Sequence, residues 1–105
     1  MPIQLMIWER RDNGDREAMG NAALDLCRII RRREGITSAK FYWYMSETIV
    51  FLAEGEAAAL DTPGQGAPAD YYRAGLAFAD NARPVLNIRL DEPRDALETY
   101  RAAGR

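Results

Sequence analysis

Large aromatic residues and one amide, spread over three segments of the chain, could bind a small organic ligand. Trp8, Tyr42, Tyr44 and Asn87 combine rings, which supply apolar contact, with indole, hydroxyl and amide groups that orient a ligand. Tyr72 could close such a pocket from a neighbouring helix. Because the same residue types are enriched where proteins meet, the pattern predicts either a ligand cleft or a subunit interface.

Two cations stand in the same segments as these rings. Arg89 and Lys40 could hold an anionic group or an enolate-like intermediate, and the planar guanidinium of Arg89 suits that role. A structural ion pair with a carboxylate is the alternative for both. Glu54 and Glu56 could supply a general base at the end of a strand, or they could be solvated loop charges.

The chain contains no histidine, and its only cysteine is Cys27. This composition excludes Ser-His-Asp and Cys-His catalysis, histidine-ligated haem, and zinc sites built from cysteine and histidine. It also excludes an intramolecular disulfide. Acid–base chemistry would therefore use a shifted carboxylate, a tyrosine, Cys27, Lys40 or bound water, and we expect neither a metal site nor a cofactor.

The composition indicates a single domain over residues 1–105. Of these residues 48% are hydrophobic and 29% are charged, and the net charge is −2. A domain of this length buries roughly 65% of its unfolded surface, which is enough for a core without disulfides or metals. The negative charge disfavours nucleic-acid binding. Since no apolar run approaches the roughly 20 residues of a membrane-spanning helix, we expect a cytoplasmic protein with no membrane partner.

The first half of the chain alternates strand and helix patterns. Residues 2–9 and 36–45 alternate apolar and polar side chains, as strands do. Between them, an apolar repeat of three and four residues predicts a helix over residues 15–34, which Gly35 ends. Its last turn carries Arg31, Arg32 and Arg33, where cations favourably meet the helix dipole. Residues 48–53 are apolar on both faces, which predicts a central strand.

The second half repeats the order of helix and strand. An apolar stripe between Tyr71 and Ala82 predicts a second helix ended by Pro84, and residues 85–90 predict the last strand. Residues 61–68 concentrate proline and glycine, which predicts a surface loop that could serve as a lid. Residues 91–105 predict a short terminal helix.

The order β-α-β-β-α-β predicts a ferredoxin-like α+β sheet with helices on one face, the first and third strands at its centre, and an extra C-terminal helix. We expect the helices to cover apolar residues of the first and last strands: Ile3, Leu5, Ile7, Leu86, Ile88 and Leu90. The opposite face would then present Gln4, Met6, Trp8, Val85, Asn87 and Arg89. The second strand would add either Lys40, Tyr42 and Tyr44 or Phe41, Trp43 and Met45. Because such an aromatic face is unstable in water, we expect a symmetric homodimer that covers it.

Over about residues 2–90, this element order and facing pattern resemble the dimeric α+β barrel superfamily, without a diagnostic motif. In that superfamily two ferredoxin-like subunits press their sheets together around paired clefts. Its members include cofactor-free oxygenases of antibiotic biosynthesis, isomerases, dehydratases and haem-degrading enzymes, the last of which use a helix-borne histidine that this chain lacks. The resemblance implies a homodimer that binds a small aromatic or acidic compound, with cofactor-independent oxygenation or isomerisation as the class of any reaction. The alternative is a non-enzymatic interaction module whose aromatic sheet face serves oligomerisation alone.

Overall fold

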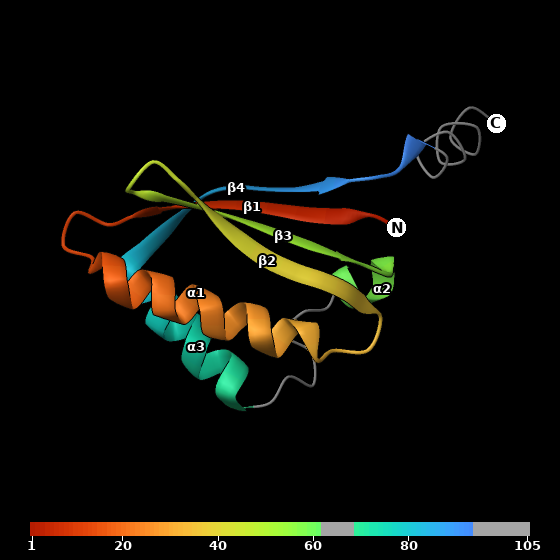
Figure 1. The fold of residues 1–105 in the computed structure, drawn as a ribbon, viewed down its shortest axis with the longest axis horizontal. Helices are drawn as coiled ribbons and strands as arrows, with labels where there is room; N and C mark the ends of the chain where they lie inside the picture. The colour runs from red at the N-terminus through yellow and green to blue at the C-terminus, as the bar shows by residue number, and fades with distance from the viewer. Residues whose placement is uncertain (62–68, 94–105) are drawn as a thin grey trace.

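The computed structural model describes residues 1–61 and 69–93. The elements follow in the order β1 (Ile3–Arg10), α1 (Arg16–Arg31), β2 (Ile36–Tyr44), β3 (Thr48–Gly55), α2 (Ala57–Asp61), α3 (Ala69–Asn81) and β4 (Ala82–Leu90). The strands form one layer, and α1 and α3 lie together on one side of it (Figure 1). The predicted ferredoxin-like α+β fold is therefore confirmed. Most of the loop expected at residues 61–68 and of the helix expected at residues 91–105 falls outside the described residues.

The sheet has the strand order β2-β3-β1-β4, and every neighbouring pair is antiparallel. The first and third strands are central, as the order of elements predicted and as the two-sided apolarity of the third strand indicated. Ile3 lies opposite Glu54 of β3 on one side and opposite Leu90 of β4 on the other. The β1–β4 register shifts between Ile7 and Trp8, which leaves Val85 without a partner in β1.

Helix α1 begins just after Asp15, as predicted, but it ends at Arg31 and not at the predicted residue 34, so Arg32 and Arg33 follow its last turn. The side chain of Asp15 accepts a hydrogen bond from the backbone nitrogen of Ala18 at 3.0 Å, which satisfies one of the free N–H groups of the first turn. Arg28 and Arg31 lie in the last turn, where their positive charge interacts favourably with the negative end of the helix dipole. Gly35 follows with a φ of +88°, a conformation that favours glycine, and the chain then enters β2.

The hydrophobic core lies between the sheet and the two long helices. Phe78 of α3 is its centre, because the ring meets Trp8 at 5.1 Å and Phe51 at 5.2 Å, both edge to face. The buried members come from both layers: Met19, Ala22, Ala23, Cys27, Ile49, Phe51, Phe78 and Ala82. Met6 and Trp8 of β1 pack against this cluster from the sheet.

The predicted assignment of the sheet faces is therefore wrong for β1 and β4. Because Met6 and Trp8 face the helices, the alternating residues of β1 lie on the opposite side, and the register places three residues of β4 beside them. We call this side the helix-free face; its central residues are Ile3, Leu5, Ile7, Val50, Leu52, Leu86, Ile88 and Leu90. On the helix side of the sheet the ring of Trp8 packs edge to face against Phe78, which places the larger side chains of β1 in the core.

For β2, one of the two predicted alternatives is confirmed. Phe41 and Trp43 pack against the core, so Tyr42 and Tyr44 lie on the helix-free face, where both are exposed. Their register partners in β3 are Val50 and Thr48. The helix-free face is consequently apolar at its centre and aromatic along its β2 edge.

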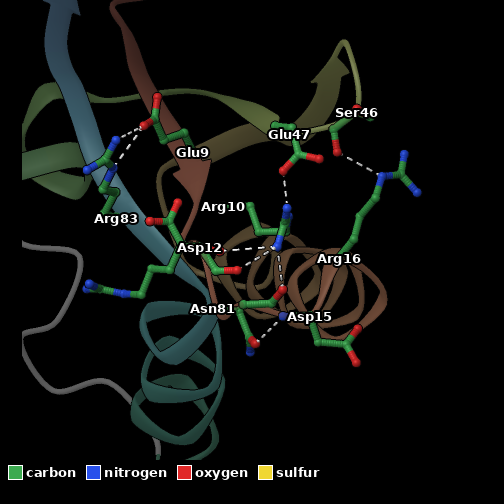
Figure 2. Close-up of polar contacts among 11 residues, drawn as sticks. Glu9, Arg10, Asp12, Asp15, Arg16, Ser46, Glu47, Asn81 and Arg83 are labelled. Carbon is green, nitrogen blue, oxygen red and sulfur yellow. Dashed lines mark hydrogen bonds and ion pairs between the residues drawn. The ribbon is translucent and has the colours of Figure 1, made fainter.

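A polar cluster fastens the end of the sheet at which β1 leads into α1 (Figure 2). Arg10 donates to Glu47 in the β2–β3 turn at 2.5 Å and to the carbonyl oxygen of Gly14 at 2.8 Å. The hydrogen bond with Glu47 raises the pKa of Arg10, so the cation is permanent. The backbone nitrogen of Asp15 donates to the side chain of Asn81 at 2.8 Å, which joins the loop to the end of α3.

Candidate functional site

A cavity of about 750 Å³ lies between the sheet and the helices, beside the N-terminal half of β1 and away from the Arg10 cluster. All four strands of the sheet contribute residues, and the opposite wall is made by α1, α2 and α3. The lining includes Gln4, Met6, Ile36, Ala53, Asn87, Arg89, Ile29, Ile30, Leu60 and Tyr71. A cavity of this volume accommodates an organic molecule of several rings.

The apolar wall is firmly packed from behind. Leu60 of α2 is buried in a small cluster with Ala39 and Ala53, and Ile30 packs against the same cluster from α1. Tyr71 of α3 completes this side of the cavity. Burial raises the pKa of the Tyr71 hydroxyl above its ordinary value, although the charge of Arg33 acts in the opposite direction. At neutral pH this hydroxyl is therefore protonated and is a hydrogen-bond donor.

A strip of hydrogen-bonded side chains crosses the sheet side of the cavity. Arg89 donates through Nη2 to Asp61 at 2.6 Å and through Nε to the side-chain oxygen of Gln4 at 2.9 Å. Gln4 in turn donates through Nε2 to the side-chain oxygen of Asn87. We call these residues the polar strip. Gln4 and Arg89 are directly opposite each other across β1 and β4, so the sheet itself fixes their spacing.

Charges of both signs stand on the helix side of the cavity. Arg32 and Arg33 follow the last turn of α1, Glu34 comes next, and Asp70 lies in the first turn of α3. Because these charges balance one another, the helix side presents no field of one sign. The guanidinium of Arg89 is the cation on the sheet side, and its side chain is 25% exposed.

The structure separates the residues that the sequence assigned to one cleft. Asn87 and Arg89 line the cavity. Trp8 faces the same side of the sheet, but its ring fills the core against Phe78. Tyr72 is exposed on α3 and meets the ring of Tyr71 edge to face at 5.6 Å.

The remaining predicted candidates lie on the helix-free face. Tyr42 and Tyr44 are exposed there, and the ammonium group of Lys40 stands 6.0 Å from the centre of the Tyr42 ring. A smaller hollow of about 340 Å³ beside Lys40 and Tyr42 also includes Glu54. The predicted cleft is thus two surfaces on opposite sides of one sheet.

Several cavity residues were not recognised as such from the sequence. Gln4 was predicted on the same face as Asn87 and Arg89, although that face was wrongly expected to lie away from the helices, and its role as the link between them depends on the β1–β4 register. Helix α2 was missed altogether, although its Ala57–Asp61 sequence is rich in alanine, the strongest helix former. This short helix brings Leu60 and Asp61 to the cavity.

Residues 1–61 and 69–93 contain no group of three or more acidic, histidine or cysteine side chains placed to hold a metal ion. In the same part of the chain, no helix has the length and apolarity required to cross a membrane.

Solved structures match the fold of this chain, whereas no protein-family model and no curated protein matches its sequence. SnoaB, a cofactor-independent oxygenase from Streptomyces nogalater, matches with a TM-score of 0.72 and 8% identity over 87% of this chain and 91% of that one. An antibiotic biosynthesis monooxygenase matches with a TM-score of 0.67 and 14% identity over 86% and 97%. Rv0793 from Mycobacterium tuberculosis matches with a TM-score of 0.65 and 19% identity over 88% and 95%. At these identities the likeness establishes the fold alone, and it confirms the resemblance that the element order indicated.

Proposed function

From the fold that this chain shares with the dimeric α+β barrel superfamily, we propose that it is a homodimer that binds a small aromatic or acidic compound in the helix–sheet cavity. The class of reaction that we propose is cofactor-independent oxygenation or isomerisation. The observation that carries the proposal is the cavity itself, which combines an apolar wall with a cation and amide groups on the opposite side. SnoaB, which has the same fold, is described as a cofactor-independent oxygenase.

Different lining residues bind the substrate, remove a proton from it and stabilise the resulting charge. Ile30, Met6 and the ring of Tyr71 hold the flat body of the substrate. Both reaction classes begin when a base removes a proton and leaves an enolate-like anion, and we assign Asp61 as that base. Arg89 stabilises the resulting negative charge because its guanidinium is fixed by hydrogen bonds on two sides. An oxygenase then transfers electrons from this anion to O₂, whereas an isomerase returns the proton to another atom.

The helix-free face supports the homodimer part of the proposal. Its centre is aliphatic, and Leu86, Ile88 and Leu90 are exposed on β4. A contiguous apolar sheet face of this kind is stable when a second sheet covers it, and a twofold symmetric pair of identical chains is the commonest arrangement. In this arrangement Tyr42 and Tyr44 contact the partner rather than the ligand.

Ligand-dependent thermal shifts test the cavity. A hydroxynaphthoic acid and a tricyclic phenol are the probes, and a saturating ligand at 100 times its Kd stabilises the protein by about 2.7 kcal/mol, which raises Tm by roughly 10 °C for a chain of this size. Ala59→Trp places a large ring in the cavity and should abolish the shift. Ala58→Trp, at the adjacent exposed position of α2, is the matched control. The proposal is contradicted if neither probe raises Tm, or if a probe still raises Tm in Ala59→Trp.

Oxygen consumption then separates the reaction classes. Wild-type protein that binds a phenol and consumes O₂ in an oxygen electrode is an oxygenase, and Asp61→Asn should reduce that rate by at least 100-fold, within the range for loss of a general base. The second candidate function is the interaction module, which the apolar helix-free face favours. A stable dimer that binds neither probe supports this second function.

A further inference from the structure

The polar strip has a direction that can be read from the chemistry of its members. Arg89 carries only donors, so each group that it contacts must offer an acceptor. At Gln4 that acceptor is the side-chain oxygen Oε1, and the amide nitrogen Nε2 is therefore turned toward Asn87. Because Nε2 is a donor, Asn87 must meet it with its own oxygen, Oδ1.

These two hydrogen bonds determine which side-chain atom of Asn87 can still bind a ligand. Its oxygen is engaged by Gln4, and within residues 1–61 and 69–93 its nitrogen Nδ2 makes no hydrogen bond. Asn87 lines the cavity and is exposed, so Nδ2 is open to a ligand or to water. Without Gln4, an asparagine amide could turn over and offer either atom, whereas here the charge of Arg89 fixes its orientation from two residues away.

We propose that the polar strip makes Asn87 an obligatory hydrogen-bond donor, so that the cavity selects ligands with a carbonyl or oxyanion oxygen and rejects ligands that offer only N–H at that point. This inference rests on the proposed small-molecule function of the cavity and names the chemical class that it takes. Gln4 is a positioning residue, since it acts through Asn87. A ligand donor placed against Nδ2 leaves two donors facing each other, and because Asn87 is exposed we expect a discrimination equivalent to about one neutral hydrogen bond.

Two neutral tricyclic probes of similar shape isolate the effect. 9-Fluorenone presents one carbonyl acceptor and no donor, whereas carbazole presents one N–H donor and no acceptor. Neither carries a charge that would form an ion pair with Asp61 or Arg89. We expect the wild-type protein to bind 9-fluorenone at least fivefold more tightly than carbazole in equilibrium dialysis, with the factor of about five corresponding to one neutral hydrogen bond.

Isosteric variants test whether the polar strip orients the amide of Asn87; we call this effect of Arg89 on Asn87 through Gln4 the relay. In Gln4→Glu the new carboxylate accepts from both Arg89 and Nδ2, so Asn87 turns its oxygen to the cavity and the preference inverts in favour of carbazole. Asn87→Asp, which places acceptors there directly, inverts it as well. Asn87→Leu keeps an apolar wall and removes the preference. Asn13→Asp makes the same chemical change as Asn87→Asp in the β1–α1 loop, near the other end of β1, and should keep the wild-type ratio.

The outcomes separate the relay from the function on which it rests. Equal affinities of the wild-type protein for the two probes, or tighter binding of carbazole, overturn the relay and leave the proposed cavity function intact. Binding of neither probe overturns both. A preference for 9-fluorenone that persists in Asn87→Leu also overturns the relay, because Asn87 is then not its source. Should Gln4→Glu fail to fold, as judged by circular dichroism, the two Asn87 variants decide the question.

Discussion

Replacing Ile88 by aspartate should dissociate the proposed homodimer into single chains. Ile88 lies on β4 directly opposite Leu5 of the central strand β1, and its side chain points to the helix-free face. It is 38% exposed, and its neighbours along the same face, Leu86 and Leu90, are 41% and 44% exposed. Together with Tyr42 and Tyr44, these residues remain exposed on the helix-free face of a single chain.

The magnitude follows from the exposed fractions. Full burial of an aliphatic side chain contributes about 1.5–3 kcal/mol, so covering the exposed two fifths of each of these residues contributes about 0.6–1.2 kcal/mol. In a twofold symmetric dimer each of these side chains is buried in both chains, so its contribution to the free energy of association occurs twice. A carboxylate at position 88 removes this gain and adds a desolvation penalty of several kcal/mol per chain, because it has no cation opposite it on β1. The dimer dissociation constant should increase by at least about 1,000-fold, which corresponds to about 4 kcal/mol.

Sedimentation velocity at micromolar concentration measures this change. The wild-type protein should sediment with twice the chain mass of 11.8 kDa, and Ile88→Asp should sediment as one chain. Leu76→Asp is the matched control, because Leu76 is 68% exposed on α3, in the layer opposite to the helix-free face. The reasoning is refuted by a wild-type protein that sediments as one chain, by an Ile88→Asp protein that stays dimeric, or by a Leu76→Asp protein that dissociates.

Three further predictions concern stability, measured by urea unfolding. Phe78→Ala should cost about 3–5 kcal/mol, because it removes the ring that Trp8 and Phe51 contact; a loss below about 1 kcal/mol would contradict that packing. Gly14→Ala should destabilise the protein by about 1–3 kcal/mol, since its Cβ would lie 2.3 Å from the carbonyl oxygen of Asn81, whereas Gly75→Ala, with open space around it, should stabilise α3 by about 0.5–1 kcal/mol. Burial raises the pKa of Cys27 from 9.0 to about 11, so the unfolded chain releases this proton first. The corresponding stability is fully present below pH 9.0 and is lost as the pH rises to about 11, a loss that Cys27→Ala should not show.

The element order was predictable because each element carries its own local signal. The alternation in β1, β2 and β4 and the apolar stripes of α1 and α3 are properties of a few neighbouring residues. Asp15 marks the start of α1, whereas Gly35 led to a predicted end that is three residues too late. Helix α2 was missed because its five residues are too few to establish a helical period. Its position also depends on what precedes it, since the backbone nitrogen of Glu56 bonds to the carbonyl oxygen of Gly35 at 2.8 Å.

The direction in which each strand faces was less predictable, because both sides of β1 carry large apolar side chains. An aliphatic set at Ile3 and Leu5 competes with Met6 and Trp8 for the core, and the usual rule that the more uniformly apolar side is buried favours the first set. The outcome depends on Phe78, an aromatic partner about 70 residues away in sequence whose ring edge receives Trp8. Long-range ring packing of this kind leaves no trace in local periodicity.

The alternating side-chain directions of a strand explain why the cavity and the helix-free face can be altered by different substitutions. Neighbouring residues of β4 point to opposite sides of the sheet, so Asn87 and Arg89 line the cavity while Ile88, between them, faces away from it. The cavity described here is lined by residues of one chain, and its apolar wall is packed from behind by α1 and α2 of that chain. Dissociation of the proposed dimer by Ile88→Asp should therefore leave the walls of the cavity in place. A single-chain Ile88→Asp protein that still binds 9-fluorenone separates assembly from binding, whereas loss of binding on dissociation assigns part of the site to the partner subunit.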